Sequence, residues 1–419
     1  MKIGVYFTPK KDEGGVYQYS VDILKALSGS KKNEIVVLTL SPDIPREFYK
    51  LKNFKIIDVN SNVREASIKA RNLIAGSLAA VTSFLIRNLY KLKIFDLITP
   101  LYRYSQKKYI EIIEKEKIDI MFYPTSSDLS FLANTPAIVT VHDLQHRLNP
   151  QFREVSAGGR WEYREYGFIN IAKNAFRVLV DSKIGKQDML KFYSQSNGKV
   201  EILPYLPPSY LDPKISPKSL DTISKKLNLP NKFIYYPSKF WPHKNHINLI
   251  KAISLLKKKG LEVNLVLTGS KDADFSTYVK VQKLINQLNL KKNIYYLGYV
   301  NPKELSVLYK KATALVMPTS FGPTNIPVLE AWLMGTPVVY SNVKGCKEQL
   351  GNAGLLINPY KPKDIAEKIQ KIYTDKNLVK KLIELGYIRV NLWNRALFTS
   401  KINEILKDFK KKHVKYSNN

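Results

Sequence analysis

The distribution of hydrophobic residues along the chain predicts a regular alternation of strands and helices. Short runs rich in β-branched and aromatic residues recur, and each is followed by a longer amphipathic stretch. In the first half we expect strands at 2–7, 34–40, 54–59, 118–123, 137–142 and 176–181. In the second half we expect them at 233–237, 263–268, 294–300, 312–317 and 337–341. This alternation indicates an α/β protein with doubly wound parallel sheets that are covered on both faces.

Length and proline content predict two domains. A chain of 419 residues is too long for one ordinary hydrophobic core, which favours two domains of about 200 residues each. The segment 203–220 holds five prolines and shows no sustained periodicity, so we expect it to be the linker. The stretch from about 376 to 412 is helical by pattern, with a bend expected at Trp393.

One turn in the second half combines the features of an anion-binding site. The apolar run 312–318 predicts a strand, Pro327 suits the first turn of the helix that follows, and Gly335 suits its end. The free N–H groups and the dipole at a helix start favour phosphate. Glu330, one turn into the helix, offers a carboxylate that can accept from two neighbouring ribose hydroxyls. The combination suits a sugar nucleotide.

These residues resemble the nucleotide-sugar signature of retaining glycosyltransferases of family 4, which have the GT-B fold of two facing Rossmann-like domains. The Pro-x-x-Glu and Gly-x-Pro-Val-Val motifs of that family correspond here to 327–330 and 335–339. Lys239 and Lys244 are similar to the basic pair that holds the donor diphosphate in the family, with Lys239 in place of the usual arginine. Further matches follow in family order at 14–17, 141–144, 267–270, 297–299 and 345–354.

The resemblance implies a domain organisation. It places an N-terminal Rossmann-like acceptor-side domain at 1–205 and a C-terminal Rossmann-like domain that binds the nucleotide sugar at 206–390. The final helix, at about 391–412, would return to the N-terminal domain.

The resemblance also implies roles for individual residues. Glu330 would hold the ribose, and Lys239 and Lys244 would hold the diphosphate together with the turn that contains Thr324, Asn325 and Ile326. His142 would orient the donor sugar beside a loop formed by Gly14 and Gly15. We therefore list His142, Lys239 and Lys244 as catalytic candidates. The donor-binding candidates are Gly14, Gly15, Thr324, Asn325, Ile326 and Glu330.

The chain departs from the family pattern at one position. The family usually carries a second glutamate eight residues before the last, and this chain has Gly322 there. The Phe-Gly that usually follows is replaced by Thr324 and Asn325. In the family the missing carboxylate commonly contacts the donor sugar, and here Asn325 or Thr324 offers replacement hydrogen bonds.

Two features of the first half point to a ligand on their own. Gly14 and Gly15 follow the first predicted strand, where glycines allow a backbone to approach a phosphate or a sugar. His142 lies at the carboxyl end of a predicted strand, where open α/β sheets place ligands. A metal site would use His142, Asp143 and His146, but no further His or Cys cluster completes a ligand shell. We expect no metal, and no cofactor apart from the donor substrate.

The charge of the chain indicates either an anionic partner or surface, or a lysine bias that is spread over solvated helix faces. Lys and Arg number 67 against 35 Asp and Glu, a net charge of +32. Basic residues bracket apolar stretches in 63–108, which suits an anionic membrane surface or a helix pair with a basic outer face. The single cysteine, Cys346, fits a reducing compartment, and the N-terminus lacks the apolar core of a signal peptide. We expect a cytoplasmic protein that is peripheral on the inner face of the cell membrane.

We therefore expect a glycosyltransferase that moves a hexose, mannose-like or similar, from a nucleotide diphosphate sugar to a glycan or a lipid-linked saccharide in surface polysaccharide synthesis. The resemblance implies retention of the anomeric configuration. One alternative is a sugar-nucleotide epimerase or hydrolase of the same fold, and another is a homologue that binds a nucleotide without turnover. A third is a non-catalytic basic protein that binds membrane or nucleic acid, although the chain shows no zinc, RNP or KH signature.

Overall fold

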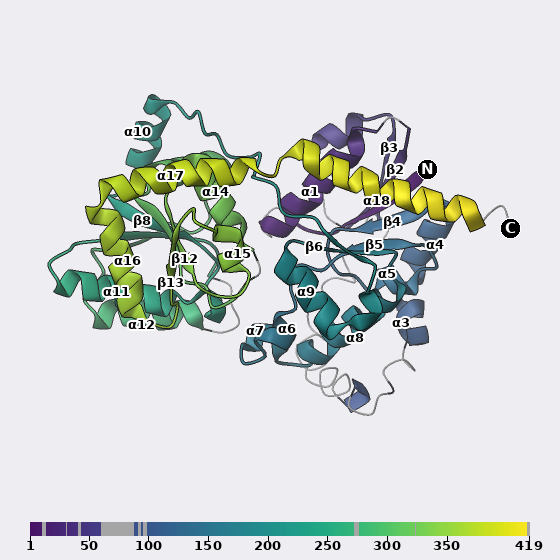
Figure 1. Cartoon of the computed structure of the whole chain (residues 1–419), viewed down its shortest axis with the longest axis horizontal. Helices are drawn as coiled ribbons and strands as arrows, with labels where there is room; N and C mark the ends of the chain where they lie inside the picture. The colour runs from purple at the N-terminus through teal and green to yellow at the C-terminus, as the bar shows by residue number, and fades with distance from the viewer. Residues whose placement is uncertain are drawn as a thin grey trace, which may run out of the picture. The chain divides into compact units, whose positions relative to one another are not determined.

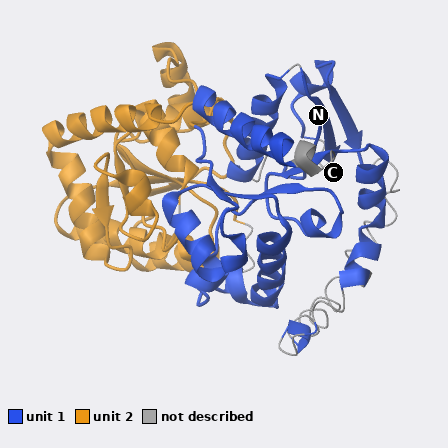
Figure 2. Ribbon diagram, turned by 45° about the vertical axis from the view of Figure 1, so that its right-hand side comes forward, with its two compact units in different colours: residues 1–206, 395–419 blue, residues 207–394 orange. Residues whose placement is uncertain are grey.

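The computed structural model describes residues 1–10, 14–30, 32–40, 43–59, 88–90, 94, 99–271, 276–322 and 324–416. The chain forms two compact units (Figure 2): unit 1 comprises 1–206 and 395–419, and unit 2 comprises 207–394. The sequence analysis placed the two domain boundaries after residues 205 and 390, whereas the boundaries between the compact units follow residues 206 and 394. Unit 2 is one continuous segment, whereas unit 1 is assembled from both ends of the chain.

Unit 1 is built on a parallel sheet of seven strands in the order β3-β2-β1-β4-β5-β6-β7. The strands are β1 (Lys2–Phe7), β2 (Glu34–Thr39), β3 (Phe54–Asp58), β4 (Ile120–Tyr123), β5 (Ala137–Thr140), β6 (Arg177–Val180) and β7 (Val200–Ile202). β1 pairs with β2 on one side and with β4 on the other, so the strand order reverses between β1 and β4. Open α/β sheets bind ligands at such a switch point.

The helices of unit 1 cover both faces of its sheet. They are α1 (Gly15–Ser28), α3 (Thr99–Ser105), α4 (Lys107–Lys115), α5 (Leu129–Leu132), α6 (Gln145–Leu148), α7 (Arg153–Ser156), α8 (Arg160–Asn174), α9 (Lys183–Phe192) and α18 (Arg395–Tyr416), with 3-10 turns η2 (Arg46–Lys50) and η4 (Ser194–Ser196). Figure 1 shows α1 and α18 together on one side of the sheet and α8 and α9 on the other.

The C-terminal helix α18 is integral to unit 1. Its Phe398 and Ile402 are fully buried. A guanidinium nitrogen of Arg395 lies 2.7 Å from a carboxylate oxygen of Asp22 on α1, and the ring of Phe409 meets the ring of Phe176 at 5.2 Å between centroids. Apolar burial and the ion pair therefore join the last helix to the first one.

Unit 2 repeats the architecture with a parallel sheet of six strands in the order β10-β9-β8-β11-β12-β13. The strands are β8 (Phe233–Pro237), β9 (Asn264–Thr268), β10 (Ile294–Tyr296), β11 (Ala314–Met317), β12 (Val338–Ser341) and β13 (Leu355–Ile357). The helices are α10 (Pro217–Lys226), α11 (His246–Lys258), α12 (Thr277–Gln287), α13 (Pro302–Lys311), α14 (Ile326–Met334), α15 (Cys346–Leu350), α16 (Pro362–Thr374) and α17 (Lys376–Asn391), with a 3-10 turn η5 (Pro242–Lys244). The switch point lies between the neighbouring strands β8 and β11.

The predicted α/β class with two parallel sheets is confirmed, and each predicted strand is present. The four residues of β11 are all buried, which is why the central strands are nearly continuous apolar runs. The prediction missed β7 and β13, whose three residues are too few to show a period. The predicted bend at Trp393 is the break between α17 and α18.

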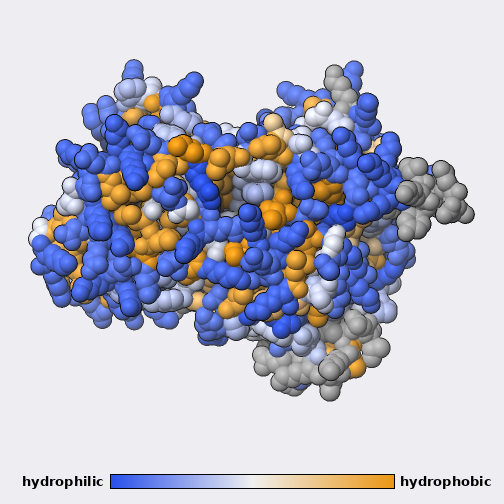
Figure 3. All heavy atoms as spheres, viewed as in Figure 1, coloured by the Kyte–Doolittle hydropathy of each residue, from blue (hydrophilic) through white to orange (hydrophobic). Residues whose placement is uncertain are grey.

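In the part of the chain that the structure describes, no helix is long and apolar enough to cross a membrane. Hydrophilic residues cover most of the face drawn in Figure 3, with hydrophobic residues interspersed among them.

Candidate functional site

Two connections meet at the switch point of unit 2. One follows β8 and contains η5, and the other follows β11 and leads into α14. The backbone N–H of Ser320 donates to the carbonyl of His243 over 2.7 Å, and the Asn245 amide donates to the carbonyl of Pro318 over 2.9 Å. The ring of His243 also stacks on Phe321 at 4.0 Å between centroids. These contacts fix the position of the basic residues after β8 relative to the start of α14.

Lys244 is a half-buried cation at this junction. Its Nζ lies 3.4 Å from Oδ1 of Asn325, and no carboxylate among the described residues forms an ion pair with it. Burial lowers the pKa of Lys244 to about 8, because a desolvated ammonium is less stable than a solvated one. The side chain is still mostly protonated at neutral pH, so the site carries a positive charge that lacks a counter-charge.

Lys239 lies on the same connection and is also half-buried. Within the described residues its ammonium forms no hydrogen bond or ion pair. The structure thus places both members of the predicted basic pair after β8, but it brings only Lys244 into contact with the residue that precedes α14.

The start of α14 has the predicted form. Asn325 is the N-cap residue, Pro327 lies in the first turn and Gly335 ends the helix in a left-handed conformation with φ of 73°. The first turn holds no acidic residue, and the Asn325 side chain does not cap the helix. Ile326 is buried and Thr324 half-buried. The N-terminal N–H groups therefore face no negative side chain from their own first turn.

Asn325 is held on both its backbone and its side chain. Its N–H donates to Oε1 of Gln349 and its carbonyl accepts from Nε2 of Gln349, both over 2.9 Å. Its Nδ2 donates to the hydroxyl of Tyr340 over 2.5 Å, and that hydroxyl donates to Gln349 Oε1 over 3.2 Å. The sequence did not predict roles for Tyr340 and Gln349. Gln349 lies in the matched segment 345–354, but nothing in a lone glutamine marks it as a partner of a turn.

Glu330 is buried and already has partners. The hydroxyl of Tyr210 donates to its Oε1 and the hydroxyl of Tyr309 donates to its Oε2. Burial raises the pKa of Glu330, and the two tyrosine hydrogen bonds oppose that rise. The sequence predicted ribose hydroxyls as the donors, and missed both tyrosines. A carboxylate has about four lone-pair sites, so ribose can share Glu330 with them or replace the half-buried Tyr210.

Gly14 and Gly15 lie beside the switch point of unit 1. Gly14 is exposed, has φ of 61° and precedes α1, whose first residue is Gly15. A Cβ at Gly14 would meet no atom within 4 Å, so the positive φ and not a close neighbour favours glycine there. The predicted loop residues 11–13 lie outside the described residues.

His142 follows β5, as predicted, but both of its ring nitrogens have partners. Nε2 lies 3.0 Å from the carbonyl of Pro124 and Nδ1 lies 2.8 Å from the hydroxyl of Tyr205. Burial lowers the pKa of His142, which favours the neutral ring. Because a carbonyl only accepts, Nε2 carries the proton and Nδ1 accepts from Tyr205. His142 must exchange one of these bonds before a ring nitrogen can contact a sugar.

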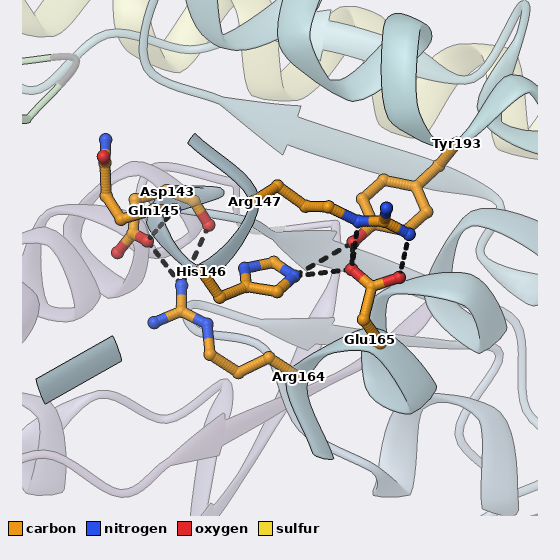
Figure 4. Close-up of polar contacts among 7 residues, drawn as sticks. All are labelled: Asp143, Gln145, His146, Arg147, Arg164, Glu165 and Tyr193. Atoms are coloured by element: carbon orange, nitrogen blue, oxygen red, sulfur yellow. Dashed lines mark hydrogen bonds and ion pairs between the residues drawn. The ribbon is translucent and has the colours of Figure 1, made fainter. Parts of the chain in front are cut away.

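A buried charge cluster follows His142 in the chain (Figure 4). The carboxylate of Glu165 on α8 accepts from His146 over 2.7 Å, from Arg147 Nε over 2.6 Å and from Tyr193 over 2.6 Å. Burial alone would raise the pKa of Glu165, but these hydrogen bonds hold it below its ordinary value. The Glu165 carboxylate is matched by the Arg147 cation and by donors from His146 and Tyr193, so the cluster anchors α6 to α8.

The candidate metal ligands of the sequence are not gathered. Asp143 pairs with Arg164 and His146 contacts Glu165 (Figure 4). His142 contacts Pro124 and Tyr205 instead. Within the described ranges, no group of three or more His, Cys, Asp or Glu side chains is arranged to hold a metal ion.

The basic region 63–108 lies largely outside the described residues. Its described part includes Arg103, which donates to Asn134 over 3.3 Å, and Lys108, which donates to the carbonyl of Val59 over 2.9 Å. Lys107 pairs with Glu111 across one turn of α4. The interpretation of this region as a membrane surface stays a prediction.

Comparisons with known proteins show which family and which solved structures the chain is similar to. Residues 220–389 match the family model described as glycosyl transferases group 1. The O-antigen chain mannosyltransferase B of Escherichia coli is 25% identical over 224 residues, which are 53% of this chain and 57% of that protein. The O-antigen chain mannosyltransferase RfbU of Salmonella typhimurium is 29% identical over 200 residues, or 48% of this chain and 52% of that protein. The chain thus spans just over half the length of these two relatives.

A solved structure covers the whole molecule. The match with sucrose-phosphate synthase from Thermosynechococcus elongatus covers 98% of this chain and 99% of that protein chain, with a TM-score of 0.70 and 18% sequence identity. At this identity the match shows a shared fold. Together the matches confirm the predicted GT-B fold and the predicted resemblance to the glycosyltransferases of family 4. Residues 220–389 therefore match the glycosyl transferases group 1 family, and the chain as a whole has the GT-B fold and resembles the glycosyltransferases of family 4.

Proposed function

We propose that the chain is a retaining glycosyltransferase that moves a hexose, mannose-like or similar, from a nucleotide diphosphate sugar to a glycan or a lipid-linked saccharide. Surface polysaccharide synthesis is the proposed setting, because two of the relatives are named as O-antigen chain mannosyltransferases. The single observation that carries the proposal is Lys244, a half-buried ammonium without a carboxylate partner among the described residues.

A diphosphate fits the surroundings of Lys244 in both charge and position. A desolvated cation is costly to a folded protein unless an anion compensates it. The N-terminus of α14 is adjacent through Asn325, and helix N-termini bind phosphate through their free N–H groups. Both groups lie at the switch point between β8 and β11, where an α/β sheet binds its ligands.

The same groups would assist the reaction. When the bond between the sugar and the diphosphate breaks, negative charge accumulates on the leaving oxygen. A fixed ammonium stabilises this charge without having to reorganise, and such stabilisation is a large term in catalysis. We assign this role to Lys244, with Lys239 as the second cation.

Glu330 is the proposed ribose ligand. Its carboxylate is fixed by Tyr309, which is fully buried, and by Tyr210, which is half-buried. Since Tyr210 is the more accessible of the two, we propose that the ribose approaches from its side. Gly14, Gly15 and His142 in unit 1 are the proposed contacts of the donor sugar.

Nucleotide binding tests the proposal without knowledge of the acceptor. We expect one nucleoside diphosphate among UDP, GDP, ADP and TDP to raise the melting temperature of the protein, because a ligand that binds only the folded state stabilises it. The rise should disappear in Lys244→Ala and remain in Lys251→Ala, an exposed lysine of α11 that serves as the matched control. An equal rise in both variants would remove Lys244 from the site, and no rise with any nucleotide would overturn the proposal.

We also propose that the protein works in the cytoplasm, at the inner face of the membrane. The net charge of +32 supports attraction to anionic lipids, which would bring the enzyme to a lipid-linked acceptor. Sedimentation with vesicles of anionic lipid at physiological salt tests this. Protein that stays in the supernatant with both anionic and neutral vesicles would contradict it.

A further inference from the structure

In the turn between β11 and α14, this chain has a polar side chain at position 325, whereas the family signature has its polar side chain at the position of residue 322. The signature has a glutamate where this chain has Gly322, and a glycine where this chain has Asn325. The two departures lie three residues apart. The chain loses a side chain at position 322 and gains one at position 325. The structure gives a physical reason why the two departures occur together.

A side chain at 322 and the Asn325 side chain compete for the same space. Gly322 has φ of 135°, a conformation that residues with a Cβ rarely adopt. A Cβ built there would lie 2.9 Å from Nδ2 of Asn325, closer than real Cβ contacts. The Asn325 amide thus occupies the place from which a residue at 322 would extend.

The amide is fixed in that place. Gln349 accepts from the backbone N–H of Asn325 and donates to its carbonyl, and Tyr340 accepts from its Nδ2. Because Nδ2 donates to Tyr340, Oδ1 is the atom of the amide that faces Lys244, whose Nζ lies 3.4 Å away. Tyr340 on β12 and Gln349 on α15 therefore hold Asn325 so that its amide oxygen faces the ammonium.

We propose that Asn325, held by Tyr340 and Gln349, is the positioning residue for Lys244 and takes the place of the signature glutamate with a neutral oxygen. The inference rests on the proposed function, because it assigns a role within the same nucleotide-sugar site. It adds that the site keeps the full positive charge of Lys244 for the donor, whereas a carboxylate at either position would neutralise part of that charge.

The groups around Lys244 are consistent with this assignment. Cys346 on α15 and His246 at the start of α11 interact with it electrostatically, and His243 interacts in turn with His246. Burial lowers the pKa of His246 to about 3, so that ring stays neutral. No carboxylate of the described chain is among these groups, and the charge on the ammonium is balanced only when an anion binds.

The first test replaces the neutral oxygen by a charged one of the same shape. Asn325→Asp keeps the size of the side chain and places a carboxylate beside Lys244. The Tyr340 hydroxyl, which accepts from Nδ2 of Asn325, can donate to the new carboxylate instead. We expect the dissociation constant of the nucleoside diphosphate to rise about tenfold, the equivalent of one unit of pKa. The loss of affinity above pH 8 should also move to higher pH, because the new carboxylate stabilises the ammonium. A role in structure alone could lower the affinity but would not move its pH dependence.

The second test restores the family arrangement. Asn325→Gly removes the amide and Gly322→Glu adds a side chain where the amide lies, so we expect each single variant to lose at least tenfold in nucleotide affinity or in donor turnover. The double variant should lose less than the product of the two single losses, because the competition for space is gone, and a double-mutant cycle measures the difference. Gln349→Leu should resemble Asn325→Gly.

The outcomes separate the inference from the function on which it rests. If the unmodified protein binds no nucleoside diphosphate, the proposed function fails. If it binds one, and Asn325→Asp and Gln349→Leu bind it with unchanged affinity and pH dependence, the function stands and this inference is overturned. Losses that simply multiply in the double variant would also contradict it, since Gly322 and Asn325 would then act independently.

Discussion

Unit 1 and unit 2 both gather polar side chains beyond the carboxyl ends of a parallel sheet, but they treat charge in opposite ways. In unit 1 the carboxylate of Glu165 is matched by His146, Arg147 and Tyr193. In unit 2 the ammonium of Lys244 has, among the described residues, only the amide oxygen of Asn325 within hydrogen-bonding distance. A cluster whose charges are matched stabilises the fold but has no unmatched charge with which to bind a ligand. A buried charge without a counter-charge makes the fold less stable but can bind an anion.

Removing the carboxylate of the compensated cluster should have the largest effect. Glu165→Ala leaves Arg147 and a buried His146 without their acceptor, and the loss of one partner of a buried pair costs about 3–5 kcal/mol. We expect thermal unfolding to show a fall in melting temperature of roughly 10 °C. The exposed Glu111→Ala on α4 is the control and should change stability by less than about 0.5 kcal/mol. Equal stabilities would mean that the cluster is not a stabilising anchor.

Removing the cation of the uncompensated site should leave the fold intact and reduce turnover. Lys244→Ala removes the proposed stabilisation of the leaving diphosphate, which we expect to lower kcat by about 10²–10³-fold. Steady-state rates with the donor that the binding screen identifies measure this, alongside a melting curve. Since a desolvated ammonium is lost, the variant should be at least as stable as the unmodified protein. Unchanged kcat would show that the charge is not used in the reaction.

The comparison also predicts a pH dependence. Lys244 has a lowered pKa of about 8 in the free protein, and a bound diphosphate would raise it. Donor affinity should therefore be constant below about pH 8 and fall by up to tenfold per pH unit above it, until the pKa of the bound state is reached. Titration calorimetry across this range measures the fall. Lys244→Arg, whose guanidinium stays charged, should remove the pH dependence even if it weakens binding.

The smallest expected effect concerns the support of Glu330. Tyr210→Phe removes one of two hydrogen bonds to a carboxylate whose pKa burial already raises, so the pKa should rise further. We expect nucleoside diphosphate affinity to fall about tenfold at pH 6 and by less at pH 8. A hydrogen bond to a charged group contributes about 1.5–3 kcal/mol, and a ribose hydroxyl would replace part of the lost interaction. Tighter binding at both values would show instead that Tyr210 competes with the ribose.

Much of the fold was predictable because it depends on local patterns. Runs such as β8 and β11 are apolar throughout, and a buried parallel strand requires nothing else. The placement of Lys244 beside the start of α14 was also predictable, because motif order and the switch point fix it. The predicted site residues of unit 1 were placed correctly at strand ends, but their partners were not foreseen.

The remainder of the site depends on contacts between residues far apart in the sequence. Tyr210 reaches Glu330 across 120 positions, and His142 reaches Tyr205 across 63. No periodicity or spacing rule encodes such a pair, since either tyrosine alone is an ordinary apolar residue with a hydroxyl. The exchange between Gly322 and Asn325 was visible in the sequence as two departures. Only the 2.9 Å approach of a Cβ to the amide shows that they are one change.

The return of α18 to unit 1 has a consequence for synthesis of the protein on the ribosome. Phe398 and Ile402 are buried, and Arg395 pairs with Asp22 of α1, so unit 1 lacks part of its core until residues 395–416 have been translated. Unit 2 is continuous and is complete once residue 394 has emerged. Domains usually fold in the order in which they are made, N-terminal first. In this chain we expect the second unit to reach its native state first, while the first waits for the last helix.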